Sequence, residues 1–331
     1  MNRLSDEALA HLRDVTERPE LPGDRYEIHE RLGRGGMGTV WRATDRELAR
    51  DVAVKVMTLP AASDRERGRL QREAHILARL EHPGIVPIHD IGQLADGRLW
   101  YAMKLVRGVA LDRAVESVSA LPARLRLFLR LCETVEFAHV QGVIHRDLKP
   151  ANVMVGPFGE VLVMDWGVAK VLGEPEEGEP AAPPSAGAAD ASGGAATDGG
   201  AATDSTSPGT VLGTPGWMAP EQAAGRAHTV DPRADVFGLG RILHALVGSE
   251  PPRRLAAIVA RAEASRPEDR YGTASELAAD IDRFLSGTAV SAYREGALEK
   301  LGRLVERHRV AILLLLAYVV MRSLLFLWGD R

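Results

Sequence analysis

The spacing of hydrophobic positions divides the chain into a strand-rich region followed by a helix-rich region. Over residues 25–106, short runs rich in Val, Trp and Tyr predict β-strands, with one helix over residues 65–80. From residue 107 onward helical spacing dominates, which predicts an α+β fold overall. Helices are predicted at 125–140, 236–247, 255–264 and 274–285, and strands at 26–32, 39–41, 52–54, 99–106, 153–155 and 161–163.

Three segments lack this globular pattern. Residues 1–24 form a polar N-terminal extension, and residues 287–309 form a basic linker. Residues 173–208 are rich in Ala, Gly, Pro, Asp and Thr, and they contain the direct repeat GGAATD. Because such a composition cannot bury enough apolar surface to offset chain entropy, this insert is predicted to be disordered.

The C-terminal run at 310–328, VAILLLLAYVVMRSLLFLW, predicts a transmembrane helix. At about 1.5 Å per residue it would be about 28 Å long, close to the ~30 Å core of a bilayer. The apolar residues outweigh the insertion cost of Arg322. Basic residues at 300–309 precede the run, so we expect a single-pass membrane protein whose main body is cytoplasmic. A buried or dimerising helix is the alternative.

Composition excludes some functional classes. The net charge of −4 gives no indication of a nucleic-acid partner. The single cysteine, Cys132, cannot form an internal disulfide and fits a reducing compartment. The first residues lack the apolar core of a secretory signal.

Two motifs in the strand-rich region suit phosphate binding. GRGGMGTV at 33–40 lies between predicted strands, where glycines let the backbone approach phosphates, although a tight hairpin is the alternative. A strand follows it, so it is not the dinucleotide-binding fingerprint. Lys55 lies in the apolar run VAVK and needs a partner or ligand to be partly buried. Glu73, on the following predicted helix, is the expected partner.

The most specific motif is HRDLKPAN at 145–152. Asp147 can orient a substrate hydroxyl and accept its proton. Lys149 can neutralise charge on a moving phosphoryl group. Asn152 and Asp165, the latter in DWG at 165–167, offer the hard oxygen ligands that Mg²⁺ prefers.

Together with APE at 219–221, these motifs resemble the eukaryotic-type serine/threonine protein kinases found in bacteria. RLGRGGMGTVWRATD and GTPGWMAPEQ are especially similar. The resemblance covers about residues 25–286. It implies a two-lobed kinase fold, with the N-lobe at 25–106, the C-lobe at 107–286 and ATP with Mg²⁺ between them. It also implies protein substrates, and a homodimer as one route to autophosphorylation in trans.

The resemblance assigns roles to individual residues. It implies that Asp147, Lys149, Lys55 and Glu73 are catalytic and that Asn152 and Asp165 bind the metal. The nucleotide-binding set it implies includes the gatekeeper Met103 and the hinge from Lys104 to Val106. That set is Gly33, Arg34, Gly35, Gly36, Met37, Gly38, Val40, Ala53, Lys55, Met103, Lys104 and Val106. It further implies three structural roles: Asp235 anchors the catalytic loop, Glu221 pairs with Arg270, and Leu77, His145 and Trp166 stack in an internal spine.

The chain departs from the family pattern in three places. Trp166 replaces the usual Phe, so its indole N–H needs a partner, and activity should survive. The segment from Asp165 to Glu221 is unusually long, which fits either a neutral insertion or a regulatory loop. The C-lobe between Asp235 and Arg270 is short and lacks helices that help dock protein substrates. Phosphorylation candidates in the loop are Thr203, Ser205, Thr206, Ser207 and, as the best single site, Thr210.

We therefore expect a membrane-anchored serine/threonine kinase. One alternative is a pseudokinase, a nucleotide-binding scaffold with weak or no transfer, and the short C-lobe keeps this alternative open. Another is a small-molecule phosphotransferase. The segment GTPGWMAPE argues against the latter, because it resembles the peptide-binding platform of protein kinases.

Overall fold

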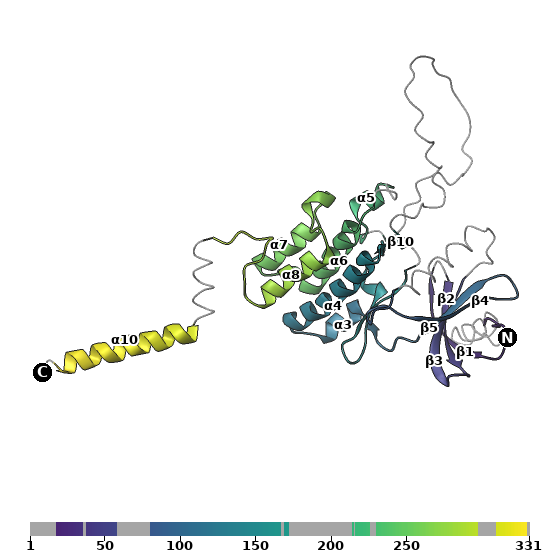
Figure 1. The fold of residues 1–331 in the computed structure, drawn as a ribbon, viewed down its shortest axis with the longest axis horizontal. Coiled ribbons are helices and arrows are strands. Elements are labelled where there is room, and N and C mark those ends of the chain that lie inside the picture. The colour runs from purple at the N-terminus through teal and green to yellow at the C-terminus, as the bar shows by residue number, and fades with distance from the viewer. Residues whose placement is uncertain are drawn as a thin grey trace, which may run out of the picture.

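The chain folds into a β-sheet lobe and a helical lobe, followed by a separate C-terminal helix (Figure 1). The computed structural model describes residues 18–35, 38–57, 80–166, 169–171, 214, 216–225, 230–296 and 309–329. The N-terminal extension up to residue 17, Gly36, Met37, Glu73, Leu77 and the insert at 173–208 lie outside these residues. The predictions made for them stay predictions.

The N-lobe is one five-stranded antiparallel sheet. Its strands are β1 (Tyr26–Gly35), β2 (Gly38–Asp45), β3 (Arg50–Met57), β4 (Ile88–Gln93) and β5 (Leu99–Lys104), in the spatial order β1-β2-β3-β5-β4. Strand β3, between β2 and β5, is buried from Val52 to Val56, because Val52, Val54 and Val56 pack into one apolar cluster and Ala53 packs into another on the opposite face. Strand β4 was not predicted from the sequence, because IHDIGQ is half exposed and does not alternate regularly between apolar and polar residues.

The C-lobe is mainly helical and is built around α4 (Leu121–Val140), whose buried positions include Leu125, Phe128, Leu131 and Val135. Their spacing of three and four residues forms one apolar face. This helix packs against α6 and α8. The other helices are α3 (Leu111–Ser117), α5 (Pro220–Ala223), α6 (Arg233–Val247), α7 (Arg253–Ala262), α8 (Ala274–Leu285) and the 3₁₀ turns η1 (Pro150–Asn152) and η3 (Pro267–Asp269).

Short strands complete the C-lobe near its junction with the sheet. Strands β6 (Val109–Ala110), β8 (Val153–Val155) and β9 (Val161–Val163) form one small sheet. Strands β7 (Val143–Ile144) and β10 (Lys170–Val171) pair with each other. The predicted 153–163 hairpin is therefore present, and it lies directly between the segments that carry Asn152 and Asp165.

The C-lobe is short where the sequence indicates it. Residues 230–296 are described throughout, and between α6 and Arg270 they form a single α-helix, α7. Helix α7 approaches α6 closely at Gly240, where a Cβ atom would lie only 2.8 Å from the Cβ of Ala262. A glycine is therefore needed at this crossing.

Residues 287–296, the first part of the predicted linker, pack back onto the C-lobe. Val290 is buried in the same core as α7 and α8. The carboxylate of Asp280, fully buried on α8, accepts hydrogen bonds from Ser291, Ala292 and Tyr271. Burial alone would raise the pKa of Asp280, but the donors from Ser291, Arg283 and Tyr271 lower it to about 2.

The C-terminal helix α10 (Arg309–Gly329) covers the run predicted to span a membrane, and it lies away from both lobes (Figure 1). Leu313 to Leu316 and Tyr318 to Met321 are all exposed. Among the helices of the described residues, none meets both the length and the hydrophobicity that a membrane crossing requires. The transmembrane assignment of 310–328 is thus not shown by the structure.

Candidate active site

A buried carboxylate fixes the backbone on which the candidate catalytic residues stand. Asp235, in the first turn of α6, accepts hydrogen bonds from the backbone N–H of His145 (2.7 Å) and of Arg146 (2.8 Å). It also contacts His139 Nε2 at 2.8 Å. Burial would raise the pKa of Asp235, but His139 and these N–H groups lower it overall. The expected anchoring role of Asp235 is present in the geometry.

Arg146, held by this anchor, has an unusual backbone conformation. Its φ is +70°, and Asp165 nearby in the site has φ +59°. A residue other than glycine in this region costs of order 1–3 kcal/mol, and the surroundings must hold it in place. The bonds to Asp235 hold Arg146, and they turn the chain so that Asp147 follows in the position described next.

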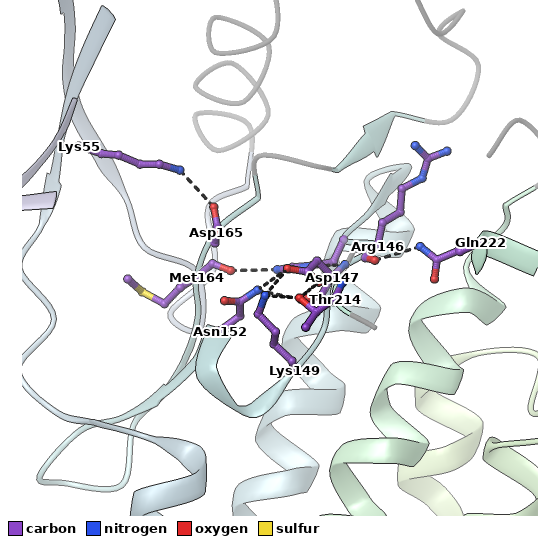
Figure 2. A network of polar contacts seen from close by, with 10 residues as sticks. Lys55, Arg146, Asp147, Lys149, Asn152, Met164, Asp165, Thr214 and Gln222 are labelled. Carbon is purple, nitrogen blue, oxygen red and sulfur yellow. Dashed lines mark hydrogen bonds and ion pairs between the residues drawn. The ribbon is translucent and has the colours of Figure 1, made fainter. Parts of the chain in front are cut away.

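Asp147 lies at the centre of a compact hydrogen-bonded network (Figure 2). Its Oδ2 accepts from Lys149 Nζ at 2.7 Å and from Asn152 Nδ2 at 3.1 Å. Its Oδ1 accepts from both the backbone N–H and the hydroxyl of Thr214, each at 3.0 Å. Lys149 Nζ also donates to Thr214 Oγ1 at 2.6 Å. The sequence pointed separately to Asp147, Lys149 and Asn152, and the structure brings them together with Thr214.

Lys55 reaches across from β3 to the C-lobe. Its Nζ is 3.1 Å from Asp165 Oδ1, and its side chain is only 10% exposed. Burial alone would raise the pKa of Asp165, but the ammonium group of Lys55 outweighs it, so the pKa lies below its ordinary value. Asp165 is therefore ionised at neutral pH. The predicted partner Glu73 lies outside the described residues, so that pairing stays a prediction.

Asn152 and Asp165 form a donor set that fits Mg²⁺. The backbone N–H of Met164 donates to Asn152 O at 2.8 Å, which places Asn152 beside the residue that precedes Asp165. The Nδ2 of Asn152 donates to Asp147 O at 2.8 Å. The amide oxygen is therefore turned away from Asp147 (Figure 2). A carboxylate and an amide oxygen are ligands that a hard divalent cation prefers.

The residues assigned to the nucleotide base share one apolar cluster between the sheet and the C-lobe. Ala53 of β3 and Met103 of β5 are buried in it, and Val40 and Val106 pack against it. Lys104, the last residue of β5, is exposed. Leu162 of β9 and Met164 also belong to this cluster, and they were not singled out from the sequence. The continuous hydrophobic run VLVM at 161–164 was the available signal.

The glycines of the β1–β2 hairpin serve two purposes. A Cβ atom at Gly33 or Gly35 would meet nothing within 4 Å, so the backbone there borders open space and fits a phosphate-binding role. A Cβ atom at Gly38 would lie 2.5 Å from the carbonyl oxygen of Val56. Gly38 is therefore also required by the contact between β2 and β3. Arg34 is exposed at the end of the hairpin.

The described part of the predicted spine is present. The rings of His145 and Trp166 lie 4.7 Å apart between centroids, and both residues are buried. The indole N–H of Trp166 donates to Val163 O at 3.3 Å, which provides the partner that its burial requires. His145 Nε2 contacts Met164 O at 2.9 Å. Trp166 therefore fills the position of the usual Phe without an unpaired indole nitrogen.

Helix α5, which carries the end of the APE motif, is joined to the rest of the C-lobe by an ion pair and by a side-chain amide hydrogen bond. Arg270 donates to both carboxylate oxygens of Glu221, at 2.7 and 2.8 Å, and its side chain is fully buried. Gln222 Nε2 donates to Arg146 O at 2.9 Å, a link not anticipated from the sequence. Its position directly after the APE motif was the only available signal. Through Gln222, helix α5 is hydrogen-bonded to the backbone of the catalytic loop at Arg146 (Figure 2).

Comparison with known proteins agrees with this geometry. The protein kinase domain family matches residues 26–284. Serine/threonine-protein kinase PknB of Mycolicibacterium smegmatis is 35% identical over 309 residues, covering 83% of this chain and 45% of the relative. Serine/threonine-protein kinase PknD of Protochlamydia amoebophila is 30% identical over 314 residues, covering 81% of this chain and 30% of the relative. This chain thus spans less than half the length of either relative.

Among solved structures, the kinase domain of Mycobacterium tuberculosis PknI is similar in fold. It superposes with a TM-score of 0.55 at 27% identity, covering 80% of this chain and 97% of that one. The chain belongs to the protein kinase family, and its fold is the protein kinase fold. The relatives named here are bacterial serine/threonine kinases, as the motifs indicated.

Proposed function

We propose that the chain transfers the γ-phosphoryl group of ATP to serine and threonine hydroxyls of protein substrates. The observation that carries this proposal is the network around Asp147, in which Lys149, Asn152 and Thr214 converge on one carboxylate. The names of the relatives support the choice of acceptor. When bound, ATP would supply the phosphoryl group and Mg²⁺ would neutralise the charge that develops on it.

Different residues of the chain serve the separate steps of binding and transfer. Asp147 orients the acceptor hydroxyl and takes its proton as transfer proceeds. Lys149, bonded to the same carboxylate, places a positive charge beside the transferred group. Lys55 would hold the phosphates, and Asn152 with Asp165 would hold the metal ion. The apolar cluster of Val40, Ala53, Met103 and Val106 would receive the base.

The alternative of a pseudokinase scaffold is not favoured. A scaffold needs neither an acceptor base nor a cation beside it, yet both Asp147 and Lys149 are present and bonded to each other. A small-molecule phosphotransferase is disfavoured by Thr214 and the segment up to Glu221. Thr214, at the start of this segment, is bonded to Asp147, so an acceptor hydroxyl at that carboxylate would lie next to a segment that resembles a peptide-binding platform.

The test is autophosphorylation of the full chain with Mg²⁺ and ATP, followed by phosphosite mapping by mass spectrometry. We expect phosphoserine and phosphothreonine, first at Thr210 or within 203–207, which lie outside the described residues. Phosphate found only on tyrosine would contradict the proposed acceptor. ATP binding without any transfer, to itself or to added protein, would favour the scaffold alternative.

We also propose that α10 attaches the kinase to a membrane, with the lobes on the cytoplasmic side. The support is the exposure of Leu313 to Leu316 and Tyr318 to Met321, each of which is at least 50% exposed. The basic residues at 300–309 lie where a cytoplasmic flank would carry them. In water these side chains would be unfavourably hydrated, and lipid would remove that cost.

Liposome flotation tests the attachment. The full chain should float with vesicles and resist alkaline extraction. The double change Leu315→Asp and Val319→Asp should abolish flotation, because each acidic residue costs about 2.5–3.5 kcal/mol in a bilayer centre. Leu48→Asp, at an exposed leucine of the N-lobe, is the matched control and should float like the parent. A parent chain that stays at the bottom of the gradient would refute the attachment.

A further inference from the structure

The turn that follows Thr214 is held at two ends. At one end, Thr214 donates two hydrogen bonds to Asp147 Oδ1. At the other, the guanidinium Nε of Arg241 on α6 donates to Gly216 O at 3.0 Å. Within the turn, Trp217 N donates to Thr214 O at 3.1 Å, and Gly216 has φ +89°. Gly216 favours this backbone conformation because it has no side chain.

Arg241 is itself oriented by a carboxylate. Its Nη1 lies 3.5 Å from Oε1 of Glu263, which follows the last turn of α7. His244, one turn further along α6, contacts the same carboxylate at 3.2 Å. The Glu263 side chain is only 17% exposed, whereas Arg241 is 39% exposed. The Glu263 carboxylate is thus the more buried of the two groups. The Arg241 guanidinium connects it to the carbonyl of Gly216 in the turn.

The short C-lobe creates this arrangement. Helix α7 begins directly after the 248–252 segment, so no other helix stands between α6 and α7. The absence of a Cβ at Gly240 lets the two helices touch, and a Cβ there would lie 3.1 Å from Glu263 Cγ. The close crossing brings Glu263 onto the same face of α6 as Arg241.

We propose that Arg241, oriented by Glu263, is a positioning residue for the peptide substrate. A hydroxyl that reaches Asp147 must come from a chain that passes the turn at 214–217, because Thr214 is bonded to that carboxylate. The residues next to the acceptor therefore contact a turn whose far end Arg241 holds. This inference rests on the proposed kinase activity, and it identifies Arg241 and Glu263 as residues that position the peptide substrate.

The chemistry of Arg241 predicts a specific kinetic signature. Among the described residues, the hydrogen bond and ion pair of Arg241 go to Gly216 and Glu263 and not to Asp147, so its loss should weaken peptide binding without slowing transfer. Loss of binding that is equal in the ground and transition states raises KM and leaves kcat unchanged. For Arg241→Ala we expect the peptide KM to rise about tenfold, as if about one tenth of the free enzyme then held the turn in its binding conformation. The KM for ATP should not change.

The experiment measures steady-state kinetics of the full chain on a synthetic peptide that spans its mapped autophosphorylation site. Arg241→Ala and Glu263→Gln are compared with Arg126→Ala, an exposed arginine on α4 that serves as the matched control. Arg241→Lys keeps the charge and one donor, so it should recover part of the affinity for the peptide. Glu263→Gln should change the peptide KM in the same direction as Arg241→Ala, by a smaller factor.

The outcomes separate the inference from the proposed function. If the parent phosphorylates neither itself nor the peptide, the kinase proposal itself fails. If the parent is active and both variants keep its peptide KM, the role of Arg241 is refuted. A fall in kcat at unchanged KM would refute it as well, because Arg241 would then act on Asp147. If Arg241→Ala does not fold, Glu263→Gln and Arg241→Lys still decide the question.

Discussion

Replacing Asp147 with Asn should lower phosphoryl transfer by about 10²–10⁴-fold, the usual contribution of a positioned general base. Asparagine keeps the shape of the side chain but cannot accept the proton of the hydroxyl. Its NH₂ group would also face Lys149 or Thr214, both of which donate to the carboxylate in the parent. The measurement is the initial rate of autophosphorylation, with ATP affinity measured on the same preparation.

ATP affinity should survive this change. Asp147 is not a member of the apolar nucleotide cluster that the described residues of β2, β3 and β5 form. Asp96→Asn, in the exposed β4–β5 turn, is the matched control and should keep the parental rate. A parental rate for Asp147→Asn would exclude it as the base. Loss of ATP binding together with transfer would show that the change disturbs more than the chemistry.

The sequence predicted the parts of the fold that rest on local periodicity. The apolar face of α4 at Leu125, Phe128 and Leu131 is readable because burial on one side of a helix repeats every three or four residues. The helices α6, α7 and α8 followed from the same signal, whereas the paired strands β8 and β9 followed from short runs of β-branched and apolar residues. Strand β4 was not predicted, because its residues are half exposed on both faces and show no clear alternation.

The catalytic residues were readable from motifs, but their mutual contacts were not. Nothing near Thr214 in the sequence shows that its hydroxyl meets both Asp147 and Lys149, because the chain between them has no readable pattern. The contact of Arg241 with Gly216 depends in the same way on how α6 crosses the C-lobe. Such contacts arise from tertiary packing, which local propensity does not encode.

Gly38 shows how a motif can suggest an incomplete reason. In the sequence it belongs to a glycine-rich run that suits phosphate binding. In the structure a Cβ atom there would collide with the carbonyl of Val56 on the neighbouring strand. Strand packing therefore requires a glycine at position 38 whether or not a phosphate is bound. Gly33 and Gly35, which border open space, fit the phosphate role better.

Glu221→Gln should destabilise the folded chain by about 3–5 kcal/mol, the usual cost of breaking a buried ion pair by removing one partner. Arg270 is fully buried, and glutamine would offer it one neutral amide oxygen in place of the carboxylate, beside the three carbonyls of Arg233, Ala264 and Ser265. These satisfy its hydrogen bonds in part but leave its charge uncompensated. The change should appear as a lower midpoint of urea unfolding with an unchanged slope.

Glu268→Gln is the matched control, because its partner Arg266 is exposed and solvent already compensates both charges. Its unfolding midpoint should equal that of the parent. If Glu221→Gln also equals the parent, the three carbonyls are sufficient for Arg270 and the ion pair is not needed for stability. If the midpoint falls as expected, activity should fall with it, because α5 carries Gln222, which holds the carbonyl of Arg146 beside Asp147.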